Sequence, residues 1–395
     1  MSNSNPLLTP APPQGWPVWR LGFRPFYLGA ALFACLSVLL WVSVFLGQVD
    51  LAVGIAPTLW HAHEMLFGFA TAVIVGFLLT AVKAWTGLPT PRGWALGGLF
   101  ALWLAARLAV FVAPYSVYAS LDMALLPLVA IALLRVLVKA GNKRNIPFIS
   151  LLLLMTVANG VFHLAARGVV QINAMSALYA QLGLIVMVVG VMGGRVIPAF
   201  TRSVNPGLNN TVSRRFEMAV LAITALAWMA WVLAVPAWLV ASLSVVAAVM
   251  HALRLWQWRP MAARQRPILW ILHVSYAWTP LGFGLLASAQ MGWVAPSLAV
   301  HAFGVGLIGG LIIGMITRTA RGHTGRQLIP TRGEVWAYGL VMAAAVLRVA
   351  VPAVRPEWLV FALHSASGLW ALAFAIYLWI YTPWLTRSRI DGKDG

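Results

Sequence analysis

The chain has 395 residues, of which 62% are hydrophobic and only 9% are charged. An ordinary soluble domain carries about 25% charged residues, so this chain cannot cover a water-facing surface, and the lipid bilayer is its environment. The composition excludes a soluble enzyme, a secreted disulfide scaffold and a disordered protein. A net charge of +19 would suggest nucleic acid binding in a soluble protein. Here the basic residues lie at the ends of apolar runs, where they indicate membrane topology.

Residues 1–19 are polar and rich in proline, and the apolar run that follows is longer than the hydrophobic part of a signal peptide. We therefore expect a flexible cytoplasmic tail over residues 1–19, and not a cleaved leader. A second short cytoplasmic tail is expected at residues 386–395. The single cysteine, Cys35, permits no internal disulfide, no Cys-x-x-Cys metal site and no covalent haem attachment.

Between these tails, continuous apolar runs are separated by short segments rich in Pro, Gly, Asn and Arg. A helix needs about 20 apolar residues to cross a bilayer, and runs without alternation favour helices over a barrel. We predict an all-α polytopic membrane protein with one membrane domain, residues 20–385. Its twelve transmembrane helices are predicted at 26–47, 58–82, 93–113, 117–139, 146–168, 174–198, 215–235, 237–257, 267–289, 297–318, 334–353 and 358–382.

The basic residues predict the orientation of these helices. When both termini are assigned to one side, that side holds all but four of the 27 Lys and Arg residues, the exceptions being Arg107, Arg167, Arg348 and Arg355. Positive residues concentrate on the cytoplasmic side of membrane proteins. We therefore expect a multi-pass protein of the bacterial inner membrane with both termini in the cytoplasm.

Short similarities recur at nearly equal intervals along the chain. Pro-Phe-Tyr at 25–27, Pro-Phe-Ile at 147–149 and Pro-Ile-Leu at 267–269 each begin an apolar run. This spacing predicts three four-helix repeats, at about 25–140, 146–258 and 267–384, around a pseudo-threefold axis normal to the membrane. The second helix of each repeat carries small residues at four-residue spacing. Such ridges serve either close helix packing or the wall of a site for a flat ligand.

Five of the eight histidines fall at one depth, near the outer ends of the predicted helices. Imidazole is a common ligand of haem iron and of copper. A lone histidine in a membrane helix is more often a hydrogen-bonded packing contact, but five at one depth favour ligation of a redox cofactor. The five are His61, His63, His163, His301 and His364, whereas His251, His273 and His323 lie toward the inner side.

The densest local motif is Trp-His-Ala-His-Glu-Met at 60–65. Residues two apart on a helix point about 200° apart, so His61 and His63 are expected to serve two separate sites unless the first turn is frayed. Glu64 is on the face of His61, where it either orients an imidazole by accepting a hydrogen bond or only complements the helix N-terminus.

Four segments together resemble the NnrS family: Leu-Gly-Phe-Arg-Pro-Phe at 21–26, the 60–65 motif, 194–202 with its Gly-Arg, Pro and Thr-Arg, and 317–326 with its Thr-Arg and Gly-His-Thr-Gly-Arg. The resemblance extends from about residue 19 to the last helix. It implies a twelve-helix bacterial inner-membrane protein that contains haem and copper and acts in the response to nitric oxide and nitrosative stress during denitrification.

We assign ligands to these cofactors by depth and by the glycine ridges. His63 and His301, beside the ridges, are the candidates for a non-covalent, b-type-like haem, and Arg107 and Arg348 are the candidate partners of its propionates unless they only extend to the headgroups. The copper candidates are His61, His163 and His364, and Glu64 is the candidate supporting acceptor.

The resulting hypothesis is an inner-membrane protein that binds, senses or detoxifies nitric oxide or a related small molecule at an outer metal site. Redox turnover of nitric oxide or its adducts is left open. Two alternatives remain: a metal or small-molecule transporter, and a structural membrane subunit without a cofactor. Twofold repeats dominate among transporters, and proton-coupled carriers usually bury acids at mid-membrane. Here only Glu64 and Asp122 lie within spans away from the inner surface.

Overall fold

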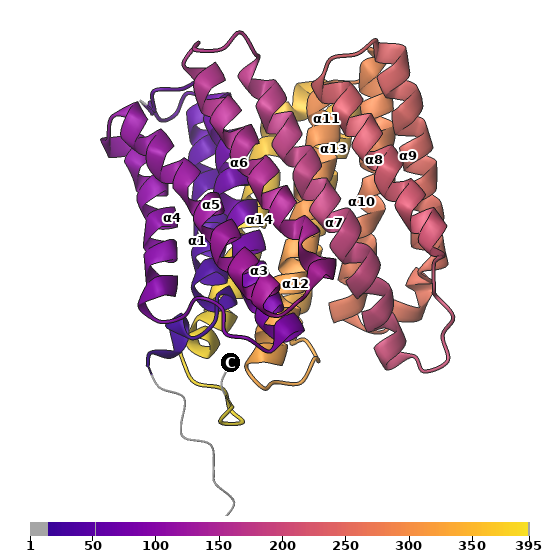
Figure 1. Cartoon of the computed structure of the whole chain (residues 1–395). Coiled ribbons are helices and arrows are strands. Elements are labelled where there is room, and N and C mark those ends of the chain that lie inside the picture. The colour runs from indigo at the N-terminus through magenta and orange to yellow at the C-terminus, as the bar shows by residue number, and fades with distance from the viewer. Residues whose placement is uncertain (1–14, 52, 394–395) are drawn as a thin grey trace, which may run out of the picture.

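The computed structural model describes residues 15–51 and 53–393, and within them all regular secondary structure is helical (Figure 1). Twelve segments are long and apolar enough to cross a membrane, which confirms the all-α, twelve-helix prediction. They are α1 (Phe23–Phe45), α2–η2–α3 (Pro57–Thr86), α4 (Trp94–Val112), α5 (Tyr115–Lys139), η3–α6 (Lys143–Ala166), α7 (Ala174–Val204), α8 (Arg214–Val232), α9 (Ala237–Gln257), α10 (Pro267–Gln290), α11–η5–α12 (Pro296–His323), α13 (Arg332–Val354) and η6–α14 (Pro356–Leu385).

The sequence explains why these helices begin where they do. Proline occupies the first turn of α6, α10 and the two composite spans, where its missing N–H costs no hydrogen bond. The N-terminus of α13 is a capping box, in which Thr331 and Glu334 satisfy each other's free backbone N–H groups. Most of the tail predicted at 1–19 lies outside the described residues, but Pro17–Trp19 form the 3-10 helix η1.

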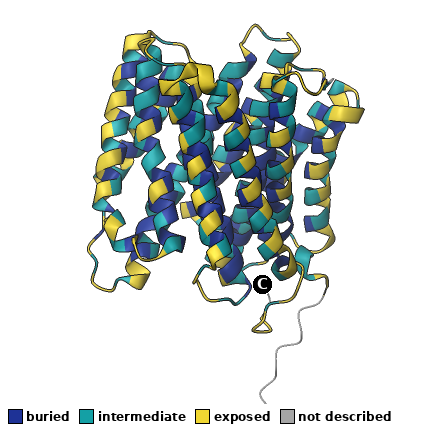
Figure 2. Ribbon diagram, turned by 180° about the vertical axis from the view of Figure 1, so that it is seen from behind, coloured by how far each residue is buried: buried dark blue, intermediate teal, exposed yellow. Residues whose placement is uncertain are grey.

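Two spans occupy the centre of the bundle. In Pro57–Thr86, 83% of the most apolar window is buried, and in Pro296–His323 the fraction is 67%, against 33% for α1. The outer helices expose large apolar side chains such as Leu36, Leu108 and Val157. Figure 2 shows exposed residues along the outward-facing sides of the outer helices. Exposed apolar rows of this kind match a hydrocarbon environment.

Both central spans contain a π-helical segment, which the sequence analysis did not predict. The π-helix η2 (Glu64–Ala70) follows α2 (Pro57–His63) and leads into α3 (Thr71–Thr86). The π-helix η5 (Ala302–Gly309) follows α11 (Pro296–His301) and leads into α12 (Gly310–His323). Each follows directly on a histidine of the predicted outer layer. π-Helical turns are rare and often mark functional sites. The residues beside η2 and η5 are therefore candidates for a functional site.

The two ends of the described chain lie at the same end of the bundle. Arg24, at the start of α1, donates hydrogen bonds from its Nη1 to the backbone carbonyls of Leu385 and Arg387, each at 2.8 Å. An even number of spans requires this arrangement. The three-repeat organisation stays a prediction.

Candidate functional site

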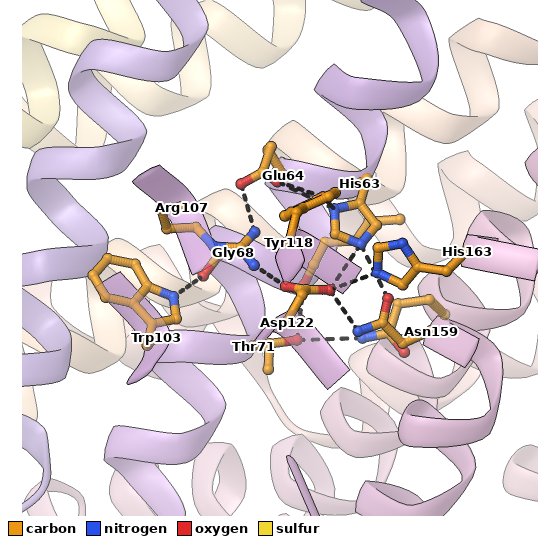
Figure 3. A network of polar contacts seen from close by, with 12 residues as sticks. His63, Glu64, Gly68, Thr71, Trp103, Arg107, Tyr118, Asp122, Asn159 and His163 are labelled. Atoms are coloured by element: carbon orange, nitrogen blue, oxygen red, sulfur yellow. Dashed lines mark hydrogen bonds and ion pairs between the residues drawn. The ribbon is translucent and has the colours of Figure 1, made fainter. Parts of the chain in front are cut away.

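A buried polar cluster joins α2, η2, α4, α5 and α6 (Figure 3). His63 ends α2, Asp122 lies on α5 and His163 lies on α6. The Nε2 atom of His63 is 3.2 Å from Asp122 Oδ2, and His163 Nε2 is 3.1 Å from the same oxygen. The three residues are buried, and their potential ligand atoms all lie within 4.8 Å of one another.

Arg107 of α4 balances the negative charge of this cluster. Its Nη1 is 2.5 Å from Glu64 Oε2, and its Nη2 forms an ion pair with Asp122 Oδ1. All three side chains are buried, with exposed fractions of 1–3%. A buried charge is tolerated only when it is paired and hydrogen-bonded, and the guanidinium supplies the counter-charge for both acids. Gly68 allows this approach, because a Cβ atom there would lie 3.1 Å from Arg107 Nη1.

The other ring nitrogen, Nδ1, of His63 and of His163 contacts a polar group other than Asp122. His63 Nδ1 is 3.2 Å from Glu64 Oε1 and 3.1 Å from the Tyr118 hydroxyl. His163 Nδ1 is 3.0 Å from the Tyr115 hydroxyl. Such contacts fix the orientation and tautomer of metal-binding histidines.

The spacing of the donor atoms fits a transition metal. Ligands bound at about 2.0–2.1 Å in tetrahedral geometry are about 3.3 Å apart, close to the 3.1 and 3.2 Å that separate Asp122 Oδ2 from the two imidazole nitrogens. The Asn159 Oδ1 atom is a further oxygen donor, 3.0 Å from His63 Nε2. Two imidazoles and a carboxylate form a donor set that suits copper or zinc.

A second feature is a mostly apolar cavity between the two central spans. His61, His301 and Arg348 line it, together with Trp41 and Gly304 among others, and it encloses an empty volume of about 960 Å³ including the space at its open side. This volume is at the upper end of the range for small-molecule and cofactor sites, about 300–1,000 Å³. His61 stacks on Trp41, with ring centroids 4.5 Å apart and an interplanar angle of 11°.

Two of the polar side chains that line this cavity, His61 and Arg348, have no polar partner among the described residues. Among the described residues, no hydrogen bond reaches the ring of His61, and no carboxylate pairs with Arg348. His301 donates from Nδ1 to the Ser297 carbonyl at 2.6 Å, which leaves its Nε2 available. The cavity thus offers imidazole nitrogens and one guanidinium to an apolar ligand with an anionic group.

The structure groups the predicted site residues differently from the sequence analysis. It brings His61 together with His301, and His63 together with His163, whereas depth and glycine ridges grouped His63 with His301 and His61 with His163. His61 lines the cavity and His63 lies in the polar cluster, and their service to two separate sites stays a prediction. His364 is exposed on α14 and lines neither feature. Arg348 lines the cavity and Arg107 lies in the polar cluster.

Glu64 contacts His63. The sequence analysis expected it beside His61, which shares its face on an α-helix. Glu64 directly follows His63 in the chain and is the first residue of the π-helix η2. Asp122, Asn159, Tyr115 and Tyr118 were not predicted as site residues. Only Asp122 carried a signal in the sequence, as an acid within a span.

The histidines toward the inner side are engaged in helix packing. His251 lies 2.9 Å from the Thr224 hydroxyl and 2.7 Å from the Tyr276 hydroxyl, and His273 Nε2 lies 2.9 Å from the Thr201 hydroxyl. These contacts match the ordinary role of a histidine within a membrane helix bundle.

The fold and these two features define a multi-pass helical membrane protein with a buried histidine–aspartate cluster beside a histidine-lined cavity. The chain belongs to the NnrS family. Residues 17–389 match this family, which is described as NnrS protein. Membership of this family fits a role in the nitric oxide response and a protein that binds metal or haem. No curated protein matches the chain.

Proposed function

We propose that the protein is a haem- and copper-containing inner-membrane protein that binds nitric oxide, or a related small molecule, in the nitrosative stress response of denitrifying bacteria. The observation that carries the proposal is the cavity in which His61, His301 and Arg348 have free polar groups among apolar walls. The family membership supports the same conclusion.

The cavity is our proposed haem site. The imidazoles of His61 and His301 are the candidates to hold the haem iron, and the Ser297 carbonyl accepts from Nδ1 of His301, which leaves its Nε2 free. Arg348 is the candidate partner of a propionate. The single cysteine excludes attachment through two thioethers, so the haem is held non-covalently. Haem held there through one of the two imidazoles would supply an iron with a position open to a diatomic gas.

The polar cluster is our proposed copper site. His63, His163 and Asp122 are the candidate ligands, and Glu64 and the two tyrosines orient the imidazoles. Arg107 holds Asp122 in its ionised form, in which a carboxylate ligates metal. This assignment replaces the grouping by depth, because depth alone does not tell which face of a helix a histidine occupies.

The orientation predicted from the basic residues places both sites toward the outer side of the membrane. Helix α1 runs outward from the cytoplasm, so α2 with His61 and His63 begins at the outer end. A nitric oxide molecule, which is uncharged and dissolves in lipid, reaches such a site from either the bilayer or the periplasm.

The alternative function is a transporter. The ion pairs formed by the buried acids argue against proton-coupled transport. Glu64 and Asp122 are both ion-paired with Arg107. A carboxylate locked to a guanidinium is a poor proton carrier, since protonation requires the ion pair to break first.

The test is a visible absorption spectrum of the purified full-length protein, with copper measured by elemental analysis. The proposal predicts a Soret band, about one haem and one copper per chain, and a spectral shift when nitric oxide is added to the reduced protein. A preparation expressed with sufficient haem and copper that shows neither cofactor would overturn it.

A further inference from the structure

A second kind of cavity lies at the opposite end of the bundle from the proposed haem site. It is formed by the end of α3, the loop between α5 and α6, and the last turns of α7, and has an empty volume of about 790 Å³ including its open side. Arg144, Arg195 and Asn145 line it on the polar side, and Trp85, Met192 and Val196 on the apolar side. None of these residues takes part in the two sites described above.

Arg195 is held in position at this cavity. Its Nη1 donates a hydrogen bond of 2.8 Å to Asn145 Oδ1, and its guanidinium lies 5.5 Å from the ring centroid of Phe148. Asn145 is buried and is itself fixed by a 3.0 Å hydrogen bond from its Nδ2 to Asn142 Oδ1. A guanidinium positioned in advance loses little entropy when it binds an anion.

The charge of the cavity is uncompensated. Arg144 and Arg195 repel each other electrostatically, and no carboxylate lines the cavity. The described acids at this end of the bundle are engaged elsewhere: Glu217 pairs with Arg254, Glu334 with Arg321 and Asp391 with Arg389. Two guanidinium groups without a counter-charge form a site for an anion with several oxygens, because each presents a planar fork of donors.

The apolar side of the cavity continues into the bundle. Met192 and Val196 also line a neighbouring cavity of about 730 Å³, whose other walls are apolar side chains and Tyr27. The charged mouth therefore leads to an apolar interior. This combination fits an amphiphile better than a free inorganic ion.

We propose that this cavity binds the phosphate of an anionic phospholipid, with Arg144 and Arg195 on the phosphate and an acyl chain along Met192 and Val196. The level of the site agrees with this ligand, since Trp85, Asn142 and Arg144 lie just beyond the ends of the membrane helices predicted from the sequence, where headgroups would meet the hydrocarbon. Free phosphate shares the headgroup's chemistry and lacks the chain, so an experiment can separate the two.

The experiment is native mass spectrometry of the delipidated full-length protein titrated with dioleoyl phosphatidylglycerol. The double variant Arg144→Gln/Arg195→Gln is expected to bind this lipid at least about tenfold more weakly than wild type. The matched control is Arg214→Gln/Arg264→Gln, which removes the same charge from two exposed positions at the same end of the bundle. The control is expected to bind as wild type does.

A second variant tests the acyl chain independently of the arginines. Met192→Trp places a bulky ring where the two cavities meet and is expected to weaken binding of dioleoyl phosphatidylglycerol more than that of its dioctanoyl analogue. Equal lipid binding by the two double variants would overturn the site. Binding of inorganic phosphate as tight as that of the lipid, or displacement of the lipid by millimolar phosphate, would overturn the phospholipid assignment.

Discussion

The guanidinium of Arg107 forms an ion pair with the carboxylate of Asp122 in the interior of the helix bundle. The pair joins α4 to α5, and Asp122 also contacts both His63 and His163. Arg107 therefore belongs to the polar cluster, and its charge stabilises the acids on which the proposed copper ligands depend.

We predict that Arg107→Leu is strongly destabilising, because it leaves Glu64 and Asp122 as uncompensated buried charges. Breaking a buried ion pair by removing one partner costs about 3–5 kcal/mol. Arg107→Lys, which keeps the charge, is expected to be milder. Thermal unfolding followed by fluorescence-detected size exclusion gives the comparison, and an unfolding temperature for Arg107→Leu equal to that of wild type would contradict the structural role of the pair.

Arg348 is expected to behave in the opposite way. It has no carboxylate partner among the described residues and faces an apolar cavity, so Arg348→Leu should leave the unfolding temperature of the haem-free protein unchanged or raise it. The same variant should lower haem retention or shift the haem reduction potential, since it removes the proposed propionate partner. Pyridine haemochrome assays and a redox titration measure these effects.

Arg107 provides the matched comparison for that experiment. Folded Arg107→Leu or Arg107→Lys protein should keep its haem content, because Arg107 does not line the cavity. Loss of haem from the Arg107 variants with full retention in Arg348→Leu would exchange the two roles and reject our assignment.

The number and position of the membrane helices follow directly from the sequence. Apolar runs are continuous, and the residues that interrupt them are those that end helices. The π-helices η2 and η5 are different, because one additional residue per turn leaves no mark on an apolar run. The sequence analysis therefore did not predict them, although each directly follows a histidine, His63 or His301.

Candidate histidines of the two sites could be chosen from the sequence, but their grouping into two sites could not. Chemistry identified His61, His63, His163 and His301, since ionisable groups in a bilayer are costly and functional. Their grouping depends on which helices are neighbours and on how each is rotated. The depth of a residue along the membrane normal tells neither which helices are neighbours nor how each helix is rotated. The contact between His63 and His163, from helices far apart in the sequence, could therefore not be predicted from depth.

The orientation of the protein in the membrane leads to a separate prediction. The basic residues concentrate at the end of the bundle that holds the C-terminal segment, so a fusion after Asp391 should be fluorescent with green fluorescent protein and inactive with alkaline phosphatase. A fusion after Glu357, between α13 and α14, should give the reverse pattern. Alkaline phosphatase activity after Asp391 would invert the topology and place both metal sites toward the cytoplasm.

Single substitutions of the histidines distinguish the two sites. His61→Ala and His301→Ala should lose haem and keep copper, because both residues line the cavity. His63→Ala and His163→Ala should lose copper and keep haem, because both contact Asp122. His364→Ala is the control and should keep both cofactors, since this side chain is exposed on α14.

The measurements are pyridine haemochrome for haem and elemental analysis for copper, both normalised to folded protein. Changing a residue that supports a metal ligand lowers metal affinity about 10–100-fold, at about 1.4 kcal/mol per tenfold, and we expect loss of a ligand itself to lower the affinity further. Loss of haem from His63→Ala and His301→Ala, with copper lost from His61→Ala and His364→Ala, would restore the grouping by depth and reject the grouping by contact. Because the two groupings exchange the roles of His61 and His63, these two residues, two positions apart on α2, give the most direct decision.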